Sequence, residues 1–519
     1  MPLGLLGSHP SAGLDALDAA DAYDVCIIGS GFSGTILGTE LAKAGARTII
    51  LESGHGMAGW LFDGRVKGLA DYEVSGDADY PTKRTKARLV GGNSNFWTGR
   101  CERMHPSDFG PHPYLPKGNP WPIDYRDLEP YYDRAERTLR VRGGELSEHM
   151  PPRQGPLPLP ASTDLASLKA QFAGAGVTVD VAPTATPTRG LRFFRIQDEV
   201  LPEFHKSKHG TLVTGVTVTR LLVGGADRRI VGAEARSLDG ATTKTVRARL
   251  FVIACGGIET PRLLLLSRSD AFPHGIGNEH DRVGRGFNEH PSTNFYAKMT
   301  HSKDTVLPRH RIGRIHQFYE TLRPQGLGSI DISVIQSWMF PHHLLPPVEL
   351  AFEAFRTLSR IRRPTLYMGP NIEMRPVDDN RVTLSRNMRD RFGNPAAHLH
   401  LDLTEDDRRT FEGAETIVRG IFDRLGATSI RKPPVVTFGR HHIGTCRMGA
   451  NPRTSVVDPS LRVHGTPNLY LLGAETFVTG GAVTPTLTIV ALAYRLAQRI
   501  PQVLPEHQAA LALGEVLAA

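Results

Sequence analysis

Cysteine is scarce in this chain. Only four of the 519 residues are cysteines, and no two of them form a Cys-x-x-Cys pair: Cys26, Cys101, Cys255 and Cys446. Disulfide frameworks and zinc sites require cysteines in clusters or at short fixed spacings, so this distribution argues against both. Cys26 also lies within an apolar segment that predicts a core strand. We therefore expect a protein of a reducing compartment, the cytoplasm.

Long hydrophobic runs are missing as well. No apolar stretch is long enough to span a bilayer. The first twenty residues contain no Lys or Arg, so they lack the charged region of a secretory signal. The formal net charge is +8, but the basic residues are scattered and form no nucleic-acid-binding motif. We expect neither a nucleic-acid partner nor a membrane contact.

Glycine, in contrast, is plentiful and ordered near the N-terminus. Residues 24–52 read DVCIIGSGFSGTILGTELAKAGARTIILE. The apolar start predicts a buried parallel strand, the following residues have the period of a helix, and 48–51 predict a second strand. A Gly-x-Gly-x-x-Gly turn lies between strand and helix, and Glu52 ends the second strand. This order is typical of a dinucleotide-binding unit.

Each residue of this unit has a physical role. Gly29 permits the tight turn, Gly31 leaves the backbone open to a pyrophosphate, and Gly34 lets the helix pack closely on the strand. The helix N-terminus offers free N–H groups and a positive dipole end to phosphates. Glu52 is placed to accept hydrogen bonds from an adenosine ribose. The pattern predicts a bound dinucleotide but does not choose between NAD and FAD.

A second glycine loop follows at 88–100, with the sequence RLVGGNSNFWTGR. Adjacent glycines followed by small polar residues can turn several N–H groups toward an anion or a flat ring. A plain surface turn would have a similar composition, but the tryptophan favours a ligand. We therefore expect the loop from Gly91 to Thr98 to contact the cofactor.

A third glycine segment follows a strand predicted at 250–254. Strand–glycine–helix junctions lie on the ligand side of open parallel sheets, which would place Ala254 and Gly256 there. Thr260 and Pro261 predict the start of the helix, as its N-cap and first residue. Because the junction is not a second Gly-x-Gly-x-x-Gly, no separate NAD(P)H-binding domain is expected.

Residues 291–435 have a different character. Short alternating segments at 329–337, 366–374, 381–385 and 397–403 predict an antiparallel sheet, and 406–425 predict a helix. His398 and His400 share one face of a strand and could form a metal pair, although no third ligand is evident.

An apolar stretch, Trp338 to Leu345, precedes a basic amphipathic helix predicted at 348–363. Such a helix fits a lid over a substrate site, and it would also fit a membrane or partner contact.

Two C-terminal segments carry polar residues suited to chemistry. Residues 440–449 read RHHIGTCRMG, and a histidine there could act as a general base near neutral pH. Further on, Thr484 and Pro485 predict the N-cap and first residue of a helix at 486–499. The dipole of that helix would favour the electron-rich pyrimidine end of a reduced flavin.

At this point the sequence resembles the glucose–methanol–choline (GMC) oxidoreductases over most of its length. The resemblance rests on the fingerprint ending in Glu52 and on GGNSNFWTG, ACGGIETPRLLLLS, EHP at 289–291, HHIGTCRMG and NLYLLGAETFVTGGAVTPTLTIVALAYRLA. The nearest branch includes pyranose oxidase, sugar dehydrogenases and bacterial glycoside oxidases. The fold that this implies is α/β, with a Rossmann-like FAD-binding domain and an α+β substrate domain built on an antiparallel sheet.

The resemblance also implies a discontinuous division of the chain. The FAD-binding domain would comprise 23–90, 200–290 and 436–500, and the substrate domain 91–199 and 291–435. An N-terminal arm, 1–22, and a C-terminal tail, 501–519, would flank them.

FAD is the cofactor that the family implies. Gly29, Gly31, Gly34 and Glu52 would hold its ADP half, and Val218 would contact the adenine. The full set expected around it is Gly29, Ser30, Gly31, Phe32, Ser33, Gly34, Glu52, Ser53, Gly91, Gly92, Asn95, Phe96, Trp97, Thr98, Val218, Ala254, Gly256, Ala474, Glu475, Pro485 and Thr486.

The implied reaction is oxidation of an alcohol to a carbonyl. His441, which matches the family's His-x-x-Gly-Thr, would accept the hydroxyl proton while a hydride passes to flavin N5. Oxygen or another acceptor would then reoxidise the flavin. From the branch alone, the expected substrate is a secondary ring hydroxyl of a sugar or glycoside.

Two positions depart from the family pattern. Relatives with a covalently bound flavin have a histidine where this chain has Phe96, so we predict dissociable FAD. The residue that usually assists the catalytic histidine is Asn or His, and here it is Thr484; His442 could assist instead. This second departure leaves open an atypical or non-redox, lyase-like reaction. The stretch Trp338 to Leu345 leaves open an apolar or lipid alcohol as substrate.

Overall fold

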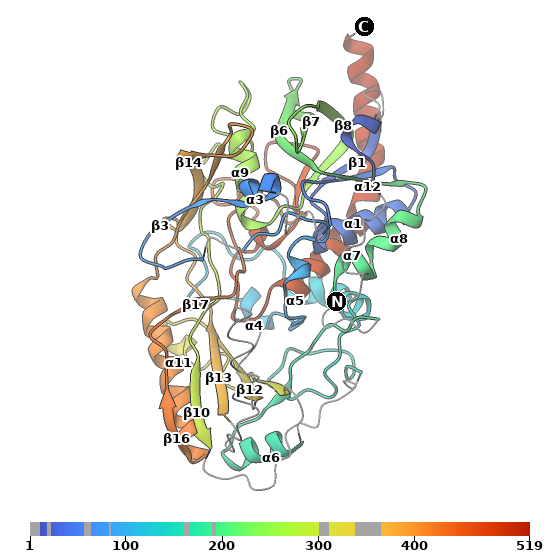
Figure 1. Cartoon of the computed structure of the whole chain (residues 1–519). Helices are drawn as coiled ribbons and strands as arrows, with labels where there is room; N and C mark the ends of the chain where they lie inside the picture. The colour runs from blue at the N-terminus through green and yellow to red at the C-terminus, as the bar shows by residue number, and fades with distance from the viewer. Residues whose placement is uncertain are drawn as a thin grey trace.

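The structure is a computed structural model that describes residues 11–17, 22–56, 64–81, 85–158, 166–188, 194–299, 311–337 and 365–518. The apolar stretch from Trp338 to Leu345 and the basic helix predicted after it lie outside these residues. The described chain forms an upper lobe around strand β1 and a lower lobe around β12 and β13 (Figure 1).

The upper lobe contains a seven-stranded sheet in the order β5-β2-β1-β8-β7-β6, with β18 also paired to β8. Its strands are β1 (Ala22–Ile28), β2 (Thr48–Glu52), β5 (Gly210–Thr214), β6 (Val216–Gly224), β7 (Arg229–Ser237), β8 (Thr243–Ile253) and β18 (Leu469–Leu471). Strands β5, β2, β1, β8 and β18 pair in parallel, whereas β6 and β7 form an antiparallel extension. Parallel strands are buried on both faces, which explains why the segments around Cys26 and Phe251 are continuously apolar.

The predicted βαβ unit is present with the expected boundaries. Helix α1 (Phe32–Lys43) begins directly after the glycine turn and connects β1 to the parallel strand β2. Helix α12 (Thr486–Ala518) packs against α1 and α5 (Tyr125–Thr138), and Asp124 caps α5 as the sequence predicts. Helix α12 begins at Thr486 as expected but continues to Ala518 through Pro501 and Pro505, beyond its predicted end at 499 and into the predicted C-terminal tail.

The prediction for the start of helix α9 was wrong. The helix (Gly256–Leu266) begins just after Cys255, so Pro261 lies inside it rather than at its first position. A proline there lacks the N–H that would bond to the carbonyl of Gly257 four residues earlier. The hydroxyl of Thr445 donates to that carbonyl instead, at 2.8 Å. A residue from a distant segment therefore compensates for the proline.

The lower lobe contains an eight-stranded antiparallel sheet, with a main order of β16-β10-β13-β12-β11-β4 and with β9 pairing β13 and β17. The strands are β4 (Asp180–Val181), β9 (Pro291–Ser292), β10 (Phe295–Met299), β11 (Arg311–Ile315), β12 (Ile330–Ser337), β13 (Thr365–Ile372), β16 (Ala427–Arg431) and β17 (Thr437–Phe438). Helix α11 (Glu405–Arg424) contacts β13 and β16. It buries Val418, Ile421 and Phe422 in a core with Ile332 and Met368. The predicted antiparallel sheet is thus confirmed for 329–337 and 366–374.

The other two predicted strands belong to a separate sheet. Strands β14 (Arg381–Arg389) and β15 (Pro395–His400) pair antiparallel, and β15 pairs in parallel with β3 (Glu73–Ser75). This three-stranded sheet brings the chain after β2 next to the second half of the sequence. The strands of the upper sheet fall within 22–90, 200–290 and 436–500, but these ranges also contain β3 and β17, which pair in the other two sheets. The predicted domain division stays a proposal.

The remaining described elements are short. They are η2 (Leu14–Ala16), α3 (Gly64–Ala70), η3 (Gly92–Asn95), α4 (Pro106–Phe109), α6 (Ala166–Gly174), α7 (Ile196–Glu199), α8 (Leu201–Lys206), η4 (Arg323–Gln325) and η6 (Ala474–Thr476). The described part of the N-terminal arm is attached to the upper sheet, because the N–H of Ala12 donates to Leu212 and Leu14 is buried.

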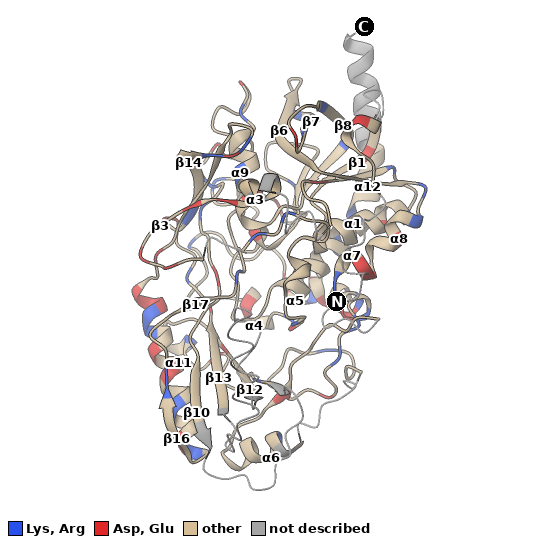
Figure 2. Ribbon diagram, viewed as in Figure 1, with Lys and Arg blue, Asp and Glu red and all other residues tan. Residues whose placement is uncertain are grey.

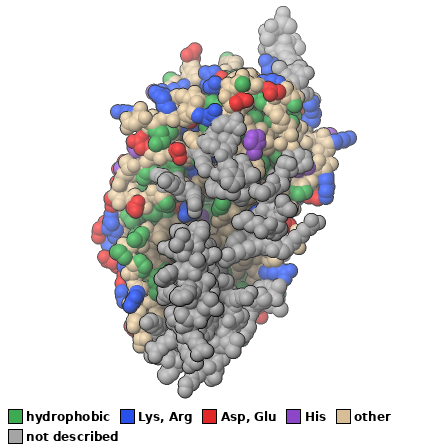
Figure 3. All heavy atoms as spheres, in the orientation of Figure 1, with side chains coloured by type: hydrophobic (Ala, Val, Ile, Leu, Met, Phe, Trp, Pro, Cys, Tyr) green, Lys and Arg blue, Asp and Glu red, His purple; other side chains and the backbone are tan. Residues whose placement is uncertain are grey.

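Charged residues of both signs alternate along the ribbon, as on α11 (Figure 2). On the face shown in Figure 3, basic and acidic atoms are likewise interspersed rather than gathered. Among the helices of the described residues, none combines the length and the apolar character that crossing a membrane requires.

Candidate active site

A cavity of ≈ 840 Å³ brings together the three glycine segments and both C-terminal segments. Ligand sites in proteins are clefts of roughly 300–1,000 Å³, so this cavity has the size of a cofactor and substrate site. The predicted site residues that line it are Gly29, Ser30, Gly31, Phe32, Ser33, Glu52, Ser53, Gly92, Phe96, Trp97, Thr98, Val218, Ala254, Gly256, His441, His442, Ala474, Thr484, Pro485 and Thr486.

Four predicted site residues do not line the cavity but support it. Gly34 packs against Gly29, because a Cβ on Gly34 would lie 2.0 Å from the carbonyl oxygen of Gly29. Gly91 has a φ of 84°, and Asn95 donates to the carbonyls of Val90 and Gly92. Glu475 is fully buried. Direct contact of these four with the cofactor stays a prediction.

The first glycine turn is held by the strands on either side of it. The N–H of Gly29 donates to Leu51 at 2.8 Å, and its φ of 105° requires a glycine. Gly31 is different, because a Cβ built there would meet nothing within 4 Å. The space beside Gly31 belongs to the cavity, so the turn exposes bare backbone at the N-terminus of α1.

Glu52 lies at the end of β2 and binds the turn. Its Oε2 accepts from the N–H of Ser30 at 3.0 Å and from the Ser30 hydroxyl at 2.7 Å, while Oε1 accepts from the N–H of Gly54 at 3.0 Å. Burial raises the pKa of Glu52, and these hydrogen bonds oppose that shift. The hydroxyl of Ser53 also donates to Oε1, at 3.4 Å, so the roughly four acceptor positions of the carboxylate are all in use, and a ribose hydroxyl would replace this longest bond.

The second glycine loop contributes an aromatic wall. Trp97 donates its indole N–H to the carbonyl of Phe194 at 2.6 Å and meets the ring of Phe32 edge-on, with 4.7 Å between ring centroids. Phe96 also lines the cavity and is 44% exposed. Trp97 is therefore a fixed part of the wall, whereas Phe96 presents a ring without nucleophilic atoms.

One edge of the His441 ring faces the cavity, and the other edge contacts a second histidine, His290. Its Nδ1 lies 2.8 Å from Nδ1 of His290, and its backbone N–H donates to Oε1 of Glu289 at 2.6 Å. Burial and the neighbouring His290 and His442 hold the pKa of His441 well below its usual value of 6.5. The ring is therefore neutral at pH 7, which is the form that can accept a proton.

The adjacent His442 is placed differently. Its Nε2 is buried and has no hydrogen-bond partner in the described structure, and its ring packs near Tyr80 and Phe287. Burial and the positive charges of Lys86 and Arg440 lower the pKa of His442 to about 3. His442 is thus a neutral packing neighbour of His441, although it also lines the cavity.

Thr484 lies at the N-terminus of α12 and points its hydroxyl at a buried carboxylate. Oγ1 donates to Oε2 of Glu102 at 2.8 Å, and the other oxygen of Glu102 accepts from Arg314 at 2.8 Å. Arg314 also pairs with Asp331 at 2.6 Å. The sequence did not identify these three buried partners, because they come from separate segments with no local motif.

The sequence also missed a polar wall contributed by the lower sheet. It consists of Arg100, Ser292, Asn294, Tyr367 and Asn371, all of which line the cavity. The hydroxyl of Tyr367 donates to the side chain of Asn294. Burial lowers the pKa of Arg100 to about 10, and its Nε has no hydrogen-bond partner in the described structure. Arg100 ends the second glycine loop, and Ser292 and Asn294 closely follow the EHP segment. The two motifs therefore lie beside these residues in the sequence, but they did not predict that the residues line the cavity.

A charged cluster lies on the same cavity near the glycine turn. Glu259 of α9 accepts from Lys86 at 2.5 Å, from Arg88 at 2.7 Å and from Arg262 at 3.1 Å. Burial lowers the pKa of Lys86 to about 8. Arg262 also pairs with Asp390 at 2.6 Å, so three basic groups face two carboxylates. The remaining positive charge would favour phosphates.

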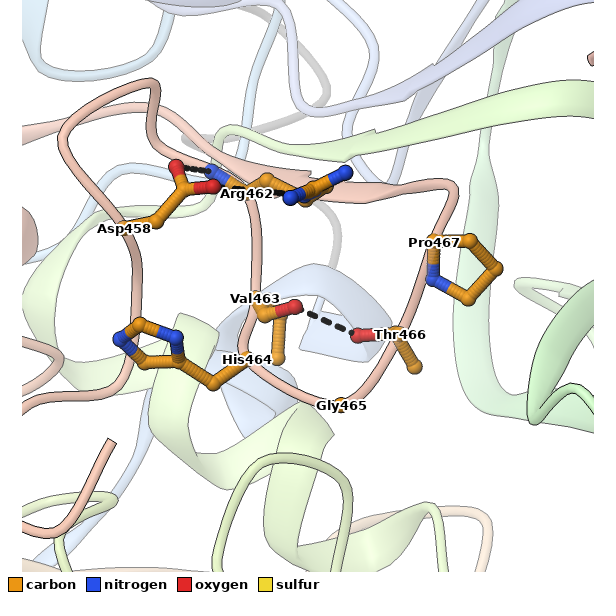
Figure 4. A pocket seen from close by; sticks show the side chains of 7 residues that line it. All are labelled: Asp458, Arg462, Val463, His464, Gly465, Thr466 and Pro467. Atoms are coloured by element: carbon orange, nitrogen blue, oxygen red, sulfur yellow. Dashed lines mark hydrogen bonds and ion pairs between the residues drawn. The ribbon is translucent and has the colours of Figure 1, made fainter. Parts of the chain in front are cut away.

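The two histidines considered as a metal pair hold a hydroxyl instead. The Oγ of Ser75 lies 2.8 Å from Nε2 of His398 and 3.0 Å from Nδ1 of His400. Within the described ranges, no group of three or more His, Cys, Asp or Glu residues could hold a metal ion. A smaller hollow of ≈ 260 Å³ in the loop 458–467 (Figure 4) shares no residue with the large cavity.

Family comparisons agree with this geometry. A family model described as GMC oxidoreductase matches residues 376–493, and a second of the same description matches 189–292. A model described as an NAD(P)-binding Rossmann-like domain matches 27–82, around the first glycine turn. The chain belongs to the GMC oxidoreductase family. As such, it is an FAD-dependent oxidoreductase acting on CH–OH groups.

Named relatives of this GMC oxidoreductase match along most of its length. It is 29% identical to paromamine 6'-oxidase of Streptomyces fradiae, covering 95% of this chain and 94% of that one. It is 26% identical to the fructose dehydrogenase large subunit of Gluconobacter japonicus, covering 92% and 97%. Among solved structures, pyridoxine 4-oxidase from Mesorbium loti matches the fold with a TM-score of 0.63 at 21% identity, covering 92% and 99%.

The cavity of this GMC oxidoreductase fits FAD. Gly31 and Gly92 face each other, since a Cβ on Gly92 would lie 3.5 Å from the Cα of Gly31, and both line the cavity. A side chain at Gly31 would occupy the space that a pyrophosphate needs. Glu52 lines the same end of the cavity, and His441 and Thr484 lie on the wall formed by the C-terminal segments.

Proposed function

We propose that this enzyme oxidises a secondary ring hydroxyl of a sugar or glycoside to a carbonyl. Three relatives support a sugar or glycoside by their names: paromamine 6'-oxidase, C-glycoside 3-oxidase of Microbacterium trichothecenolyticum and pyranose 2-oxidase of Tricholoma matsutake. Only the last two names point to a secondary ring hydroxyl, because position 6' of a hexopyranoside is an exocyclic primary alcohol. The observation that carries the reaction type is that His441 shares one cavity with the dinucleotide-binding turn.

His441 is the group that accepts the hydroxyl proton. Its ring is neutral at pH 7, and Nδ1 is already bonded to His290, so the other ring nitrogen remains for the substrate. When bound, FAD supplies a hydride acceptor for the carbinol carbon. Removal of the hydroxyl proton by His441 leaves an alkoxide, which releases hydride more readily than the alcohol does.

Thr484 supports a substrate with more than one hydroxyl. Glu102 is paired with Arg314 and is therefore a carboxylate, so the hydrogen between Glu102 and Thr484 belongs to Thr484. Toward the cavity, Thr484 consequently offers lone pairs. It can accept from a hydroxyl next to the one that His441 deprotonates, as a sugar or a 1,2-diol provides. Arg100 and Asn371 add further hydrogen-bonding groups on the polar wall.

A second candidate substrate is a small 1,2-diol. The chain is 28% identical to 2-methyl-1,2-propanediol dehydrogenase of Mycolicibacterium austroafricanum, covering 93% of this chain and 96% of that one. The acceptor role of Thr484 suits both substrate classes. The several hydrogen-bonding groups of the polar wall favour the sugar or glycoside, which has more hydroxyls than the diol. A base and a second polar group on one cavity also favour redox chemistry over the lyase-like alternative.

An anaerobic absorbance experiment tests the proposal. The purified holoenzyme is mixed with glucose, a C-glycoside, 2-methyl-1,2-propanediol or an apolar alcohol, and the loss of yellow colour is followed. Bleaching by the sugar or the glycoside is expected, and bleaching by the diol alone would favour the second candidate. The speed of recolouring in air then distinguishes oxygen from another acceptor. A holoenzyme that none of these alcohols bleaches would overturn the proposal.

Two matched variants distinguish the loss of the catalytic base from a general effect on folding. His441→Gln should retain FAD and reduce about 100- to 10,000-fold more slowly, since a positioned general base contributes that much. His464→Gln serves as the control, because His464 bonds to Ser455 and does not line the cavity. Reduction of His441→Gln at the wild-type rate would remove His441 from the mechanism.

The cytoplasm remains our proposed location. All four cysteines are free, and Cys26, Cys101 and Cys446 are buried. Free thiols persist most readily where the surroundings are reducing.

A further inference from the structure

A hydrogen-bonded chain of two histidines runs from a backbone turn to the cavity. The carbonyl oxygen of Gly481 lies 2.9 Å from Nε2 of His290, and that of Gly480 lies 3.3 Å from the same nitrogen. On the other side of the ring, Nδ1 of His290 lies 2.8 Å from Nδ1 of His441. The two rings meet edge to face, with 5.0 Å between their centroids and an interplanar angle of 71°.

The chemistry of these groups fixes the position of each hydrogen. A carbonyl oxygen only accepts, so Nε2 of His290 must carry the hydrogen that faces Gly481. Burial lowers the pKa of His290, so its ring is neutral and its Nδ1 has no hydrogen. Nδ1 of His290 is then an acceptor, and the hydrogen between the rings belongs to Nδ1 of His441.

We propose that His290 is a positioning residue that holds His441 in the tautomer with a bare Nε2 facing the cavity. Nε2 of His441 has no hydrogen-bond partner in the described structure, and it is not among the fully buried, unpartnered atoms. Its lone pair is therefore free to receive a substrate proton. In the other tautomer Nε2 would carry a hydrogen, and the base would be lost.

Burial and backbone hydrogen bonds hold His290 in one position. His290 is completely buried. Its backbone N–H donates to Oε2 of Glu289 at 2.7 Å, while Oε1 of the same carboxyl accepts from the backbone of His441 at 2.6 Å. Glu289 thus ties the backbones of both histidines together, and Tyr80 donates to Oε1 at 2.8 Å. The two rings keep one geometry without help from the substrate.

Two substitutions of His290 test its two hydrogen bonds separately, the one to His441 and the one to Gly481. His290→Asn keeps an acceptor near the position of Nδ1, which can still take the hydrogen of His441. His290→Gln places its amide near the position of Nε2, where it can donate to Gly481 but no longer reaches His441.

The first readout is the ¹⁵N spectrum of histidine-labelled holoenzyme, which needs no substrate. The signal of His441 is identified by its loss in His441→Gln. A bare Nε2 and a protonated Nδ1 are expected in the wild type and in His290→Asn, and a mixture of tautomers in His290→Gln. Only the kinetic consequence of this inference rests on the proposed function. The spectrum therefore tests the tautomer of His441 even if none of the alcohols reduces the flavin.

The second readout is anaerobic reduction by the alcohol that bleaches the wild type. His290→Gln should lower the limiting rate by roughly 10- to 100-fold, a part of what a positioned base contributes, with little change in substrate dissociation constant. His290→Asn should recover most of that rate, and His464→Gln should change neither readout. The proposal is wrong if His441 keeps a bare Nε2 in His290→Gln, or if Asn and Gln shift the tautomer equally.

Discussion

The hydroxyl of Thr484 donates a hydrogen bond to the buried carboxylate of Glu102, with 2.8 Å between Oγ1 and Oε2. Glu102 is in turn held by Arg314, so the direction of the Thr484 hydroxyl is set from behind the cavity wall. A threonine anchored in this way can replace the longer Asn or His that the family resemblance implies. It cannot reach as far, but it presents a fixed acceptor.

Replacing Thr484 by Val therefore should weaken polyol binding selectively. The change keeps the shape, removes the acceptor and leaves Oε2 of Glu102 without its donor. One neutral hydrogen bond contributes about 0.5–1.5 kcal/mol, so the dissociation constant of a sugar or diol should rise by about 2- to 12-fold. Anaerobic titration of flavin reduction measures it. Thr484→Ser is the matched control, and equal weakening of a monohydric alcohol would contradict the assigned role.

The sequence predicted those parts of the molecule whose geometry is local. The turn from Gly29 to Gly34 and the acidic end of β2 follow from a contiguous pattern, and the structure reproduces them. The polar wall is different, because Arg100 and Tyr367 are far apart in sequence and line one cavity only in the folded chain. A period of two identifies the strand that carries Tyr367, but it does not identify what the strand faces.

Helix α9 shows why a local rule can fail. Thr260 and Pro261 form a good helix start, yet the helix begins at Gly256, and Thr445 supplies the donor that Pro261 lacks. That donor comes from the segment after His441, which no local pattern connects with α9. The residue that compensates for Pro261 is thus also part of the His-x-x-Gly-Thr motif.

Removal of the Thr445 hydroxyl should consequently destabilise the protein. Thr445→Val leaves the buried carbonyl of Gly257 without a donor, and an unsatisfied buried group costs about 1–3 kcal/mol. The apparent midpoint of thermal unfolding of the apoprotein should fall, and Thr445→Ser should restore it. An unchanged midpoint in Thr445→Val would mean that water or a shift of α9 satisfies the carbonyl.

Two glycines of the same turn should respond oppositely to alanine. At Gly31 the added methyl group would meet no protein atom within 4 Å but would enter the cavity. Gly31→Ala should therefore raise the dissociation constant of FAD while leaving the thermal midpoint of the apoprotein unchanged. At Gly34 the methyl group would lie 2.0 Å from the carbonyl oxygen of Gly29. Gly34→Ala should destabilise the apoprotein by about 1–3 kcal/mol, as overpacked sites do.

Each glycine variant serves as the control for the other. Thermal unfolding of the apoprotein and fluorescence titration with FAD report the two effects separately. A Gly31→Ala protein with wild-type FAD affinity would show that the phosphates do not approach the turn.

FAD should be released intact when the protein is denatured. The ring of Phe96 lines the cavity at the position where covalent relatives have histidine, and a phenyl ring offers no atom for such a bond. Acid precipitation should leave the yellow colour in the supernatant, with the absorption and mass of free FAD. Flavin that stays with the precipitate and survives digestion as a flavin-peptide would contradict a dissociable cofactor.

The pH dependence of flavin reduction should reveal the shifted base. Ionisable groups near His441 are His290, His442, Arg100, Arg314 and Glu289. Burial has the largest effect and holds the pKa of His441 well below 6.5, together with His290, His442, Arg100 and Arg314. The ring of His441 therefore stays unprotonated on mild acidification. Burial raises the pKa of Glu289, which bonds to the backbone of His441, to about 8, so its titration lies at the upper end of the range. The limiting rate of anaerobic reduction should accordingly stay level from about pH 7 to about pH 6 and fall only at lower pH. Thermal unfolding at each pH provides the stability control. A rate that halves near pH 6.5 would mean that the base has an ordinary pKa and is not the buried His441.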